Sequence, residues 1–407
     1  MKGPLAGVKV LEMSTFVAAP VCARLLSDLG ATVIKVEHPN GDAWRVTGAS
    51  FVPERFSDDE NPVFDIYNTG KKLISLNIKT KEGQEAFHKL LSETDVFVTN
   101  VRTQSLKRLG LSYEDLKDKY PSLIYAAVLG YGEKGPDAAK PAFDTTAFWS
   151  RSGFLRDMAV AGEHYMPVNA PSSVGDTLTG MFLLSEICAA LYRRQHTGEG
   201  DYVRSCLYHN GIFAMGTMAI VTQKPFGNIY PKERVAYGAP DGSYQCSDGE
   251  WIFLSVGYAD DARIPSLCKA ADRLDLLEDP RFIDAESRLA NRNDYYNEFR
   301  QIFLQKTSTE WIKLAEEFDF PLVKMNHFAD VSEDEQAWAN DFLEHVEFAS
   351  GNTDVMPRSP VEMNSVGELK TVPAKQIGAD TEEVLKELGY TSEQIKDMHD
   401  IGAVKMG

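Results

Sequence analysis

The residue with the clearest chemical potential is an aspartate that precedes a long apolar run. Asp176 stands in the segment Gly-Asp-Thr-Leu-Thr-Gly at 175–180, directly before MFLLSEICAAL. An aspartate ahead of a helix is usually its N-cap. A carboxylate held ionised at a helix N-terminus is also able to attack an activated carbonyl. Gly175 and Gly180 carry no side chain and would let an acyl group approach, so the structural and the chemical interpretation both stand.

The motifs of several common enzyme classes are absent from the chain. No GxGxxG follows the first expected strand, and neither GxxxxGK[ST] nor GxSxG occurs. The eight histidines form no HExxH, and the five cysteines are widely spaced without a CxxC pair. These absences argue against a dinucleotide or P-loop fold, a serine hydrolase, a zinc site and a disulfide framework. We therefore expect no metal and no tightly bound cofactor, in a reducing compartment.

Composition and charge limit the partners that the protein is expected to have. The chain has 407 residues, of which 43% are apolar, and this is enough for two domains with sizeable cores. Its formal charge of −18 repels nucleic acid and anionic membrane surfaces, so neither is an expected partner. The apolar runs look too short and too interrupted to span a bilayer, and the N-terminus lacks a signal-peptide core. We expect a soluble cytoplasmic protein.

The elements that must position Asp176 follow from the periodicity of the apolar residues. Short apolar runs alternate with helix-like segments in the N-terminal part, which predicts an α/β fold whose parallel sheet is covered on both faces. Binding groups then belong at the carboxyl ends of the strands. The predicted strands lie at 7–13, 31–37, 72–78, 95–99 and 123–128, and the predicted helices at 20–29, 79–94 and 175–194. Further along, a hairpin is expected to turn at Asp248-Gly249, and the second of two short C-terminal helices to be capped at Thr391-Ser392.

Two more groups of residues accompany the strand ends. The turn STFVAAP at 14–20, with Pro20 as the first helical residue, is either a plain capped loop or a site where free N–H groups meet an anion or acyl group. The Gly- and Pro-rich loop at 129–144 is long enough to be functional or mobile. Basic side chains near the strand ends are expected to form solvated surface, and they are Lys71, Lys72, Lys79, Arg102, Lys107 and Arg108.

Several segments, taken together and in order, resemble one enzyme family. They are PLAGVKVLEMSTFVAAPVCARLLSDLGATVIKVEHPNGDAWR, NTGKKLISLNIKTKEG, DVFVTNVRTQSLKRLGLSYEDL, SLIYAAVLGYGEKGP, GDTLTG and TGEGDYVRSCLYH. From residue 4 to about 225, and again near 330–390, the chain is similar to the family III CoA-transferases, the group of the formyl-CoA and carnitine CoA-transferases. The resemblance implies a Rossmann-like large domain from residues 1–225 and 330–407, and a smaller α+β domain at 226–329. It also implies two subunits that interlock as a homodimer.

The resemblance further implies a reaction and its nucleophile. Asp176 matches the family aspartate that attacks an acyl-CoA thioester, giving first an aspartyl anhydride and then an aspartyl-CoA thioester. CoA and acyl-CoA are then substrates rather than bound cofactors, and the exchange needs neither ATP nor metal. The expected partners are an acyl-CoA, a carboxylic acid and a second copy of the chain. N–H groups near Gly175 and in the Phe16–Ala18 loop are expected to stabilise the oxyanions that form.

The family's CoA contacts carry over to named positions. Lys79 and Arg108 suit phosphate oxygens. His38 stands where several members have arginine, and Lys35 or Arg45 is expected to compensate. A mobile loop is expected at 235–242, where the chain reads VAYGAPDG. The implied CoA contacts are Val17, Ala18, His38, Leu76, Lys79, Asn100, Val101, Arg102, Arg108, Phe143 and Asp144.

The acyl group is inferred from weaker features of the sequence. The segments EDEQAWANDFLEHVEF and GYGEKGPD resemble the branch that exchanges CoA between 2-hydroxy acids and 2-enoyl-CoA in amino-acid fermentation. Carnitine-like or short dicarboxylic acids, racemisation of an acyl-CoA, and CoA binding without catalysis are the alternatives. Related racemases have a histidine where this chain has Phe143, and phenylalanine transfers no proton. Five side chains are candidates for an apolar acyl pocket, although at least three of them are expected to belong to the core, and the five are Phe16, Phe148, Trp149, Phe154 and Met158.

Overall fold

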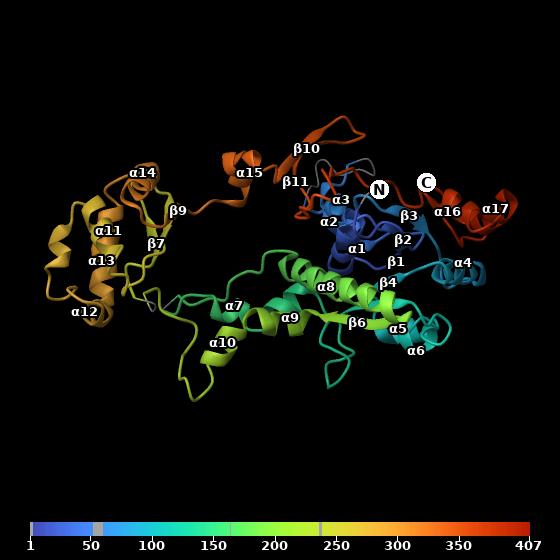
Figure 1. Ribbon diagram of the computed structural model, residues 1–407, viewed down its shortest axis with the longest axis horizontal. Helices are drawn as coiled ribbons and strands as arrows, with labels where there is room; N and C mark the ends of the chain where they lie inside the picture. Colours follow the sequence, from blue (N-terminus) through green and yellow to red (C-terminus); the bar gives the residue numbers. More distant parts are fainter. Residues whose placement is uncertain (1–2, 52–59, 163, 236–237) are drawn as a thin grey trace. The chain divides into compact units, whose positions relative to one another are not determined.

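The computed structural model describes residues 3–51, 60–162, 164–235 and 238–407 (Figure 1). The chain forms two compact units. The first comprises Met1–Phe154, Ala170–Ala219 and Ser332–Gly407, and the second comprises Leu155–Asn169 and Ile220–Val331. Asp176 and every residue with an implied CoA contact belong to the first unit.

A six-stranded parallel sheet forms the centre of the first unit. The strand order is β3-β2-β1-β4-β5-β6, and the order reverses at β1, where Val10 pairs with Val33 on one side and with Val96 on the other. Ligands of open α/β sheets bind outside the carboxyl ends of the strands at such a reversal. The predicted parallel α/β sheet is confirmed. Its strands are β1 Lys9–Met13, β2 Thr32–Glu37, β3 Lys72–Ser75, β4 Val96–Thr99, β5 Ile124–Leu129 and β6 Asp201–Cys206.

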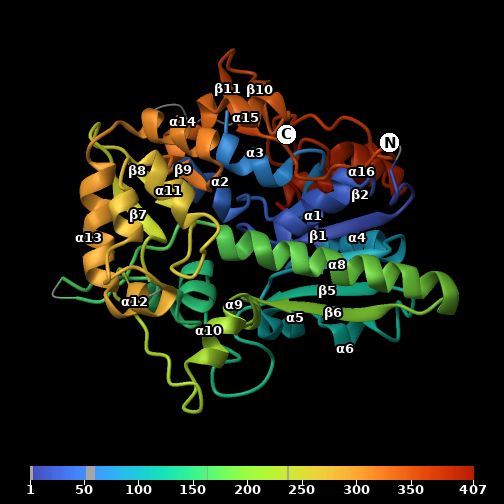
Figure 2. The ribbon, with the colours of Figure 1, turned by 60° about the vertical axis from the view of Figure 1, so that its left-hand side comes forward.

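Helices cover both faces of this sheet (Figure 2). Successive strand residues point to opposite faces. Val10 and Val96 therefore pack with α1 and α8, while Leu11 and Phe97 pack with α4 on the other face. The helices of the unit up to α9 are α1 Ala18–Asp28, α2 Ala43–Ala49, α3 Pro62–Asn68, α4 Lys81–Ser92, α5 Thr103–Arg108, α6 Tyr113–Leu116, the π-helical η1 Asp144–Ser150, α8 Val174–Thr197 and α9 Leu207–Ala214. Three short elements cross the unit boundaries, namely α7 Phe154–Asp157, α10 Gly216–Val221 and η3 Phe328–Glu333.

The C-terminal segment returns to the free edge of the sheet at β3 (Figure 1). The backbone N–H of Leu73 donates to Asp380 Oδ2 at 2.8 Å, and that of Ser75 donates to Thr381 Oγ1 at 2.9 Å. β3 ends at Ser75 rather than at 78, because the N–H of Asn77 turns away to donate to the carbonyl of Ala403 at 2.7 Å. The elements of this segment are α15 Glu335–Ala339, β10 Leu343–Glu347, β11 Thr353–Pro357, α16 Thr381–Glu387 and α17 Ser392–Asp400. The predicted cap of the last helix is confirmed, since Thr391 accepts from the N–H of Gln394.

The second unit is built on a three-stranded antiparallel sheet with the order β7-β8-β9. β7 Gly242–Gln245 and β8 Trp251–Leu254 form the predicted hairpin, and Gly249 in its turn has a φ of 84°, where glycine is favoured. Aromatic side chains fill the core beneath the sheet, among them Tyr244 and Trp311. The other elements are β9 Leu322–Lys324, α11 Ile264–Ala270, η2 Leu274–Leu277, α12 Ala285–Ala290, α13 Arg292–Phe303 and α14 Ser308–Phe318.

Among the described residues, one helix is long and apolar enough to cross a membrane by length and composition, and it is α8. The expectation that every apolar run is too short is therefore wrong for this helix. Within the first unit α8 packs on α1 and the sheet through Leu183 and Ile187. A core helix meets the same length and composition criteria, so these criteria alone carry no conclusion about a membrane.

Candidate active site

Asp176 lies in the first turn of α8, and it is not the cap of that helix. Ser173 occupies the N-cap position with a φ of 69°, in the left-handed region, and Asp176 is the third helical residue. The N-cap interpretation of Asp176 is therefore wrong. The N-terminal turns of α8 lie against the start of α1, because Gly180 contacts the backbone of Ala18 just after β1. This contact places Asp176 near the reversal point of the sheet.

Burial, rather than the helix N-terminus, decides the charge state of Asp176. Loss of solvent and then the nearby carboxylate of Asp144 raise the pKa of Asp176 to about 7. The expectation that the helix N-terminus holds this carboxylate fully ionised is therefore wrong. Near neutral pH the side chain therefore exchanges between a protonated form and a nucleophilic ionised form. In this pH range small changes of environment alter the ionised fraction of the carboxylate.

Asp144 forms the second half of a carboxylate pair. It begins η1 and is 6% exposed, and its burial raises its pKa to about 6. The Trp149 indole and the N–H groups of Ser173, Gly175 and Asp176 face it and oppose this rise. None of these donors reaches either carboxylate oxygen in hydrogen-bond geometry, so both oxygens remain without a hydrogen bond among the described residues. Such a pair titrates as one coupled system.

The two glycines of the Asp176 segment allow close packing of helices. A Cβ at Gly175 would lie 2.2 Å from Asp144 Oδ1 and 2.3 Å from Phe148 Cγ. A Cβ at Gly180 would lie 2.5 Å from the carbonyl oxygen of Ala18. The space beside both glycines is filled by protein, so the expectation that they leave room for an acyl group is wrong. They instead bring Asp144 and the start of α1 close to Asp176.

The loop between β1 and α1 is held in an unusual conformation at this edge. Phe16 has a φ of 64°, which non-glycine residues rarely adopt, and its N–H donates to Asp42 Oδ1 at 3.1 Å. The Asn100 side chain bonds both backbone groups of Thr15, accepting from its N–H at 3.0 Å and donating to its carbonyl at 2.5 Å. α1 begins at Ala18, two residues before Pro20, so Pro20 is not the first helical residue. The first N–H groups of α1 therefore open beside the loop.

A buried cluster of opposite charges supports this loop from below. Lys35 Nζ lies 2.9 Å from Glu12 and from Asp42 and donates to the carbonyl of Ser14. Lys71 Nζ lies 2.7 Å from Glu12 and donates to the carbonyl of Pro20. Lys35 is completely buried and Lys71 nearly so, so neither is available to an external phosphate.

Two earlier expectations about basic residues are corrected by these contacts. Arg45 donates twice to Glu37 at 2.8 Å, so neither it nor Lys35 compensates for the histidine at position 38. Lys71 is not part of a solvated face, because it pairs with Glu12 in the interior.

The remaining predicted CoA contacts lie around the carboxyl edge of the sheet. Val17 and Ala18 are buried at the start of α1, and Leu76 is buried in the core on the α4 side. Phe143 is exposed and packs edge-on against Phe16 with ring centroids 5.5 Å apart. Asn100 and Val101 are half-buried, and exposed side chains that follow β2, β3 and β4 are His38, Lys79, Arg102 and Arg108. Within the described ranges, no hydrogen bond or ion pair joins these exposed side chains to Asp176. The predicted loop at 235–242 includes residues 236 and 237, which lie outside the described residues.

The aromatic residues beside the site differ from those expected. Phe148 and Trp149 are buried and pack with Phe154 in the interior, so they do not line an open pocket. Met158 is exposed and belongs to the second unit. Phe16 instead joins Trp44, at a centroid distance of 6.1 Å, and Trp44 in turn neighbours Phe51 and Tyr67.

Sequence reasoning missed Tyr67 altogether. Burial, and after it the carboxylates of Asp176 and Asp144, raise the pKa of its hydroxyl, so Tyr67 belongs to the electrostatic surroundings of both carboxylates. The only sequence signal is its place near the end of the short, largely apolar segment NPVFDIYN. That signal does not distinguish a core tyrosine from one beside a nucleophile.

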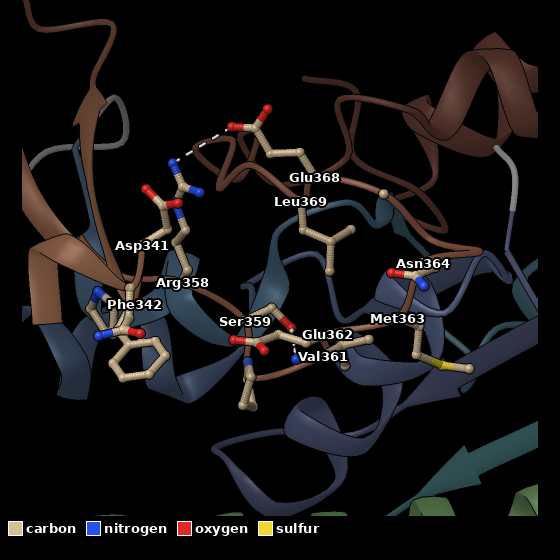
Figure 3. Close-up of a pocket in the computed structure, with 14 residues that line it drawn as sticks. Asp341, Phe342, Arg358, Ser359, Val361, Glu362, Met363, Asn364, Glu368 and Leu369 are labelled. Atoms are coloured by element: carbon tan, nitrogen blue, oxygen red, sulfur yellow. Dashed lines mark hydrogen bonds and ion pairs between the residues drawn. The ribbon is translucent and has the colours of Figure 1, made fainter.

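A large cavity of the first unit lies away from these residues. It has a volume of about 1030 Å³ and is lined by residues between 340 and 369, including Arg358 and Glu368 (Figure 3). None of its lining residues is a predicted site residue. Within the described part of the chain, no group of three or more His, Cys, Asp or Glu side chains has the arrangement of a metal site.

The fold and the Asp176 segment define a known class of enzyme. The sequence profile of CoA-transferase family III matches residues 5–381, and the chain belongs to this family. It is therefore a family III CoA-transferase, with CoA thioesters as substrates. The resemblance to this family, drawn from the sequence segments, is confirmed.

Among its relatives is the (R)-2-hydroxy-4-methylpentanoate CoA-transferase of Clostridioides difficile, which is 43% identical over 98% of this chain and 99% of that protein. The cinnamoyl-CoA:phenyllactate CoA-transferase of Clostridium sporogenes is 37% identical over 97% and 95%. A solved CAIB/BAIF family protein from Brucella suis, 26% identical, covers 95% of this chain and 100% of its own with a TM-score of 0.82.

Proposed function

We propose that the protein transfers CoA between a 2-hydroxy acid and a 2-enoyl-CoA or related acyl-CoA. The observation that carries this proposal is the 43% identity, across nearly the whole of both chains, to a transferase named for a 2-hydroxy acid. The second relative is likewise named for a 2-hydroxy acid, phenyllactate, and for an enoyl thioester, cinnamoyl-CoA. We place the exchange in amino-acid fermentation in the cytoplasm, as the sequence suggested.

The proposed chemistry begins and ends with the ionised side chain of Asp176. A carboxylate oxygen attacks the thioester carbonyl of the donor, the C–S bond breaks, and CoA thiolate leaves an aspartyl anhydride. The thiolate attacks the aspartyl carbonyl, the donor acid leaves, and an aspartyl-CoA thioester remains. The acceptor carboxylate then attacks this thioester and releases CoA thiolate again. Finally the thiolate attacks the acceptor carbonyl of the new anhydride, which frees Asp176 and the product thioester.

The neighbours of Asp176 support each of these steps. Its pKa of about 7 leaves a substantial ionised fraction at neutral pH. The carboxylate of Asp144 disfavours a second negative charge beside it, so the uncharged aspartyl anhydride and aspartyl-CoA thioester avoid this repulsion. We infer that N–H groups at the start of α1 and of α8 donate to the oxyanions that form during these steps. The exposed side chains of Lys79, Arg102 and Arg108 supply positive charge for the phosphates of CoA.

We propose that two chains interlock, with a large domain from 1–225 and 330–407 and a small domain at 226–329. Large apolar side chains that are more than half exposed in the single chain support an extensive contact between subunits. They include Phe213, which is 71% exposed, and Ile229, which is 78% exposed. Sedimentation at low concentration tests this point, and a compact folded monomer of 45.3 kDa contradicts it.

Racemisation is the alternative that the residues disfavour. It needs a proton-transferring side chain at position 143, and the exposed phenylalanine there has no proton to transfer. Short dicarboxylic acids have support from a human relative named succinyl-CoA:glutarate CoA-transferase, which is 28% identical over 98% of this chain and 90% of that protein.

Trapping the covalent intermediate tests the proposed function. The protein is incubated with an acyl-CoA, treated with hydroxylamine or borohydride, and digested for mass spectrometry. A modification on Asp176, lost in an Asp176→Asn variant, is the expected result. Exchange of the α-hydrogen for deuterium without any adduct points to a racemase, and the absence of both points to CoA binding without catalysis.

A further inference from the structure

A second, smaller cavity in the first unit is lined by residues from the N-terminal turns of α8, the helix that carries Asp176. It has a volume of about 170 Å³ and opens between α1, α3, α8 and residues 357–360. Its apolar wall, which defines what we call the α1–α3–α8 cavity, consists of Val21, Leu25, Ile66, Tyr67, Thr177 and Met181. Thr177 follows Asp176 in the chain, and Tyr67 interacts electrostatically with Asp176. The wall of the cavity therefore includes the residue that follows the nucleophile on α8 and a tyrosine from the electrostatic surroundings of its carboxylate.

The charged groups at the border of this cavity are already paired. Arg24 Nε donates to both carboxylate oxygens of Asp28 at 2.9 Å. Arg358 faces Glu368 at 3.6 Å, as Figure 3 shows, and Glu344 at 3.7 Å. Arg358 Nε has no hydrogen bond, a feature that a substrate carboxylate could use. The two guanidinium groups, of Arg24 and Arg358, nevertheless face three carboxylates, of Asp28, Glu344 and Glu368. The border of the cavity therefore carries no surplus positive charge, and it favours an uncharged group of the substrate over a carboxylate.

The size of the cavity also fits an uncharged group. A cavity of roughly 150 Å³ lined by aliphatic side chains is known to bind benzene. The α1–α3–α8 cavity, at about 170 Å³, therefore has room for a phenyl ring or for a branched four-carbon chain. Each methylene that leaves water for such a wall improves binding by up to about fourfold.

We propose that the α1–α3–α8 cavity binds the apolar side chain of the acyl group while the acyl carbonyl lies at Asp176. The cavity thereby selects branched aliphatic or aryl monocarboxylic acids over short acids and over dicarboxylic acids. This inference rests on the proposed function and names the substrate class of the same site. Met181 and Ile66 are specificity-determining residues in this arrangement, because they form part of its wall on α8 and on α3.

The test compares acyl-CoA preferences in filled and widened cavities. Steady-state kcat/KM is measured with acetyl-CoA, 4-methylpentanoyl-CoA, 3-phenylpropanoyl-CoA and succinyl-CoA, using one common acceptor acid. In Met181→Trp the ratio of 4-methylpentanoyl-CoA to acetyl-CoA is expected to fall at least about tenfold. In Ile66→Ala the ratio of 3-phenylpropanoyl-CoA to 4-methylpentanoyl-CoA is expected to rise. Ala189→Trp adds the same ring to an exposed position two turns further along α8 and should leave both ratios unchanged.

The outcomes separate this inference from the proposed function. An unchanged ratio in folded Met181→Trp, or a natural preference for succinyl-CoA over 4-methylpentanoyl-CoA, overturns the inference. Should Met181→Trp not fold, the Ile66→Ala ratio decides alone, and no rise overturns it. Adduct formation on Asp176 is followed in every variant with acetyl-CoA. Missing adducts with all four thioesters in the unaltered protein refute the proposed function, whereas adducts with unaltered ratios refute only the cavity's role.

Discussion

Replacing Asp176 by asparagine is expected to stabilise the folded protein while it ends CoA transfer. Asparagine cannot form the anhydride, so transfer stops. The stability effect follows from the pKa of Asp176, which burial and Asp144 raise from 3.8 to about 7 on folding. A raised pKa means that folding favours the protonated form. The contribution of this group to stability is therefore complete below about pH 4 and is lost as the pH rises through about 7.

The size of the effect follows from the same shift. The difference between 3.8 and about 7 is about three pKa units, and each unit corresponds to about 1.4 kcal/mol. Water that reaches the half-buried side chain screens part of this energy, so we expect the charged form to cost about 2–4 kcal/mol above pH 7. The asparagine variant avoids this cost. Its advantage should grow by about 1–2.5 kcal/mol between about pH 5 and about pH 8, because part of the cost is already present at pH 5.

Urea unfolding at both pH values, at one protein concentration, measures this advantage. Asp284→Asn is a matched control, because Asp284 is an exposed helix cap whose pKa is lowered by hydrogen bonds from Ser287. The control should show no advantage that grows with pH. If the difference in unfolding free energy between Asp176→Asn and the unaltered protein is the same at both pH values, the argument from burial is refuted. Undiminished transfer in a folded variant would refute the nucleophile.

Three further predictions follow from the same region. Asp144→Asn removes the charge that helps to raise the pKa of Asp176, so the acid limb of the single-turnover CoA-release rate should move to lower pH, and an unmoved limb contradicts the coupling. Gly180→Ala places a Cβ 2.5 Å from a carbonyl oxygen of α1 and should lower the free energy of unfolding, measured by thermal denaturation, by about 1–3 kcal/mol. In the control Gly216→Ala the new Cβ has no atom within 4 Å, so the free energy of unfolding should change by less than about 1 kcal/mol, and equal effects of the two substitutions disprove the packing argument. Asp42→Ala should lower kcat/KM about tenfold by releasing the loop between β1 and α1, because it removes both the acceptor of the Phe16 N–H and a charge partner of Lys35. Asp42→Asn restores the acceptor alone and should recover part of the activity; two equally active variants show that the hydrogen bond is unimportant.

The sheet was predictable because its strands are buried on both faces and read as short apolar runs. The segments VLEM in β1 and VFVT in β4 show this pattern. The short connections between successive strands and helices leave few possible sheet topologies. Asp176 was predictable only through the resemblance of its whole segment to a family. The N-cap of α8 was not predictable, because it depends on the left-handed backbone of Ser173. The charge state of Asp176 was not predictable either, because it depends on burial and on the approach of Asp144.

Buried charges were the largest gap between sequence and structure. Lysine next to lysine at 71 and 72 is typical of a solvated surface, yet Lys71 is buried against Glu12 while Lys72 pairs with exposed glutamates of α16. Sequence spacing carries no information on Glu12, which lies 59 positions before Lys71 in the chain and on β1, two strands away from β3 in the sheet. Partners of this kind emerge only when the strands are assembled.

The hydrogen bonds that Asp380 and Thr381 make with β3 have a consequence for synthesis of the chain. A ribosome releases these two residues only near the end of translation, long after the six strands have emerged. Until then β3 is an unprotected border, to which a strand of another nascent chain can add. A premature stop shortly before Asp380 would therefore remove more than two small helices, and we expect such a truncated chain to accumulate as aggregate rather than as a soluble enzyme of lower activity.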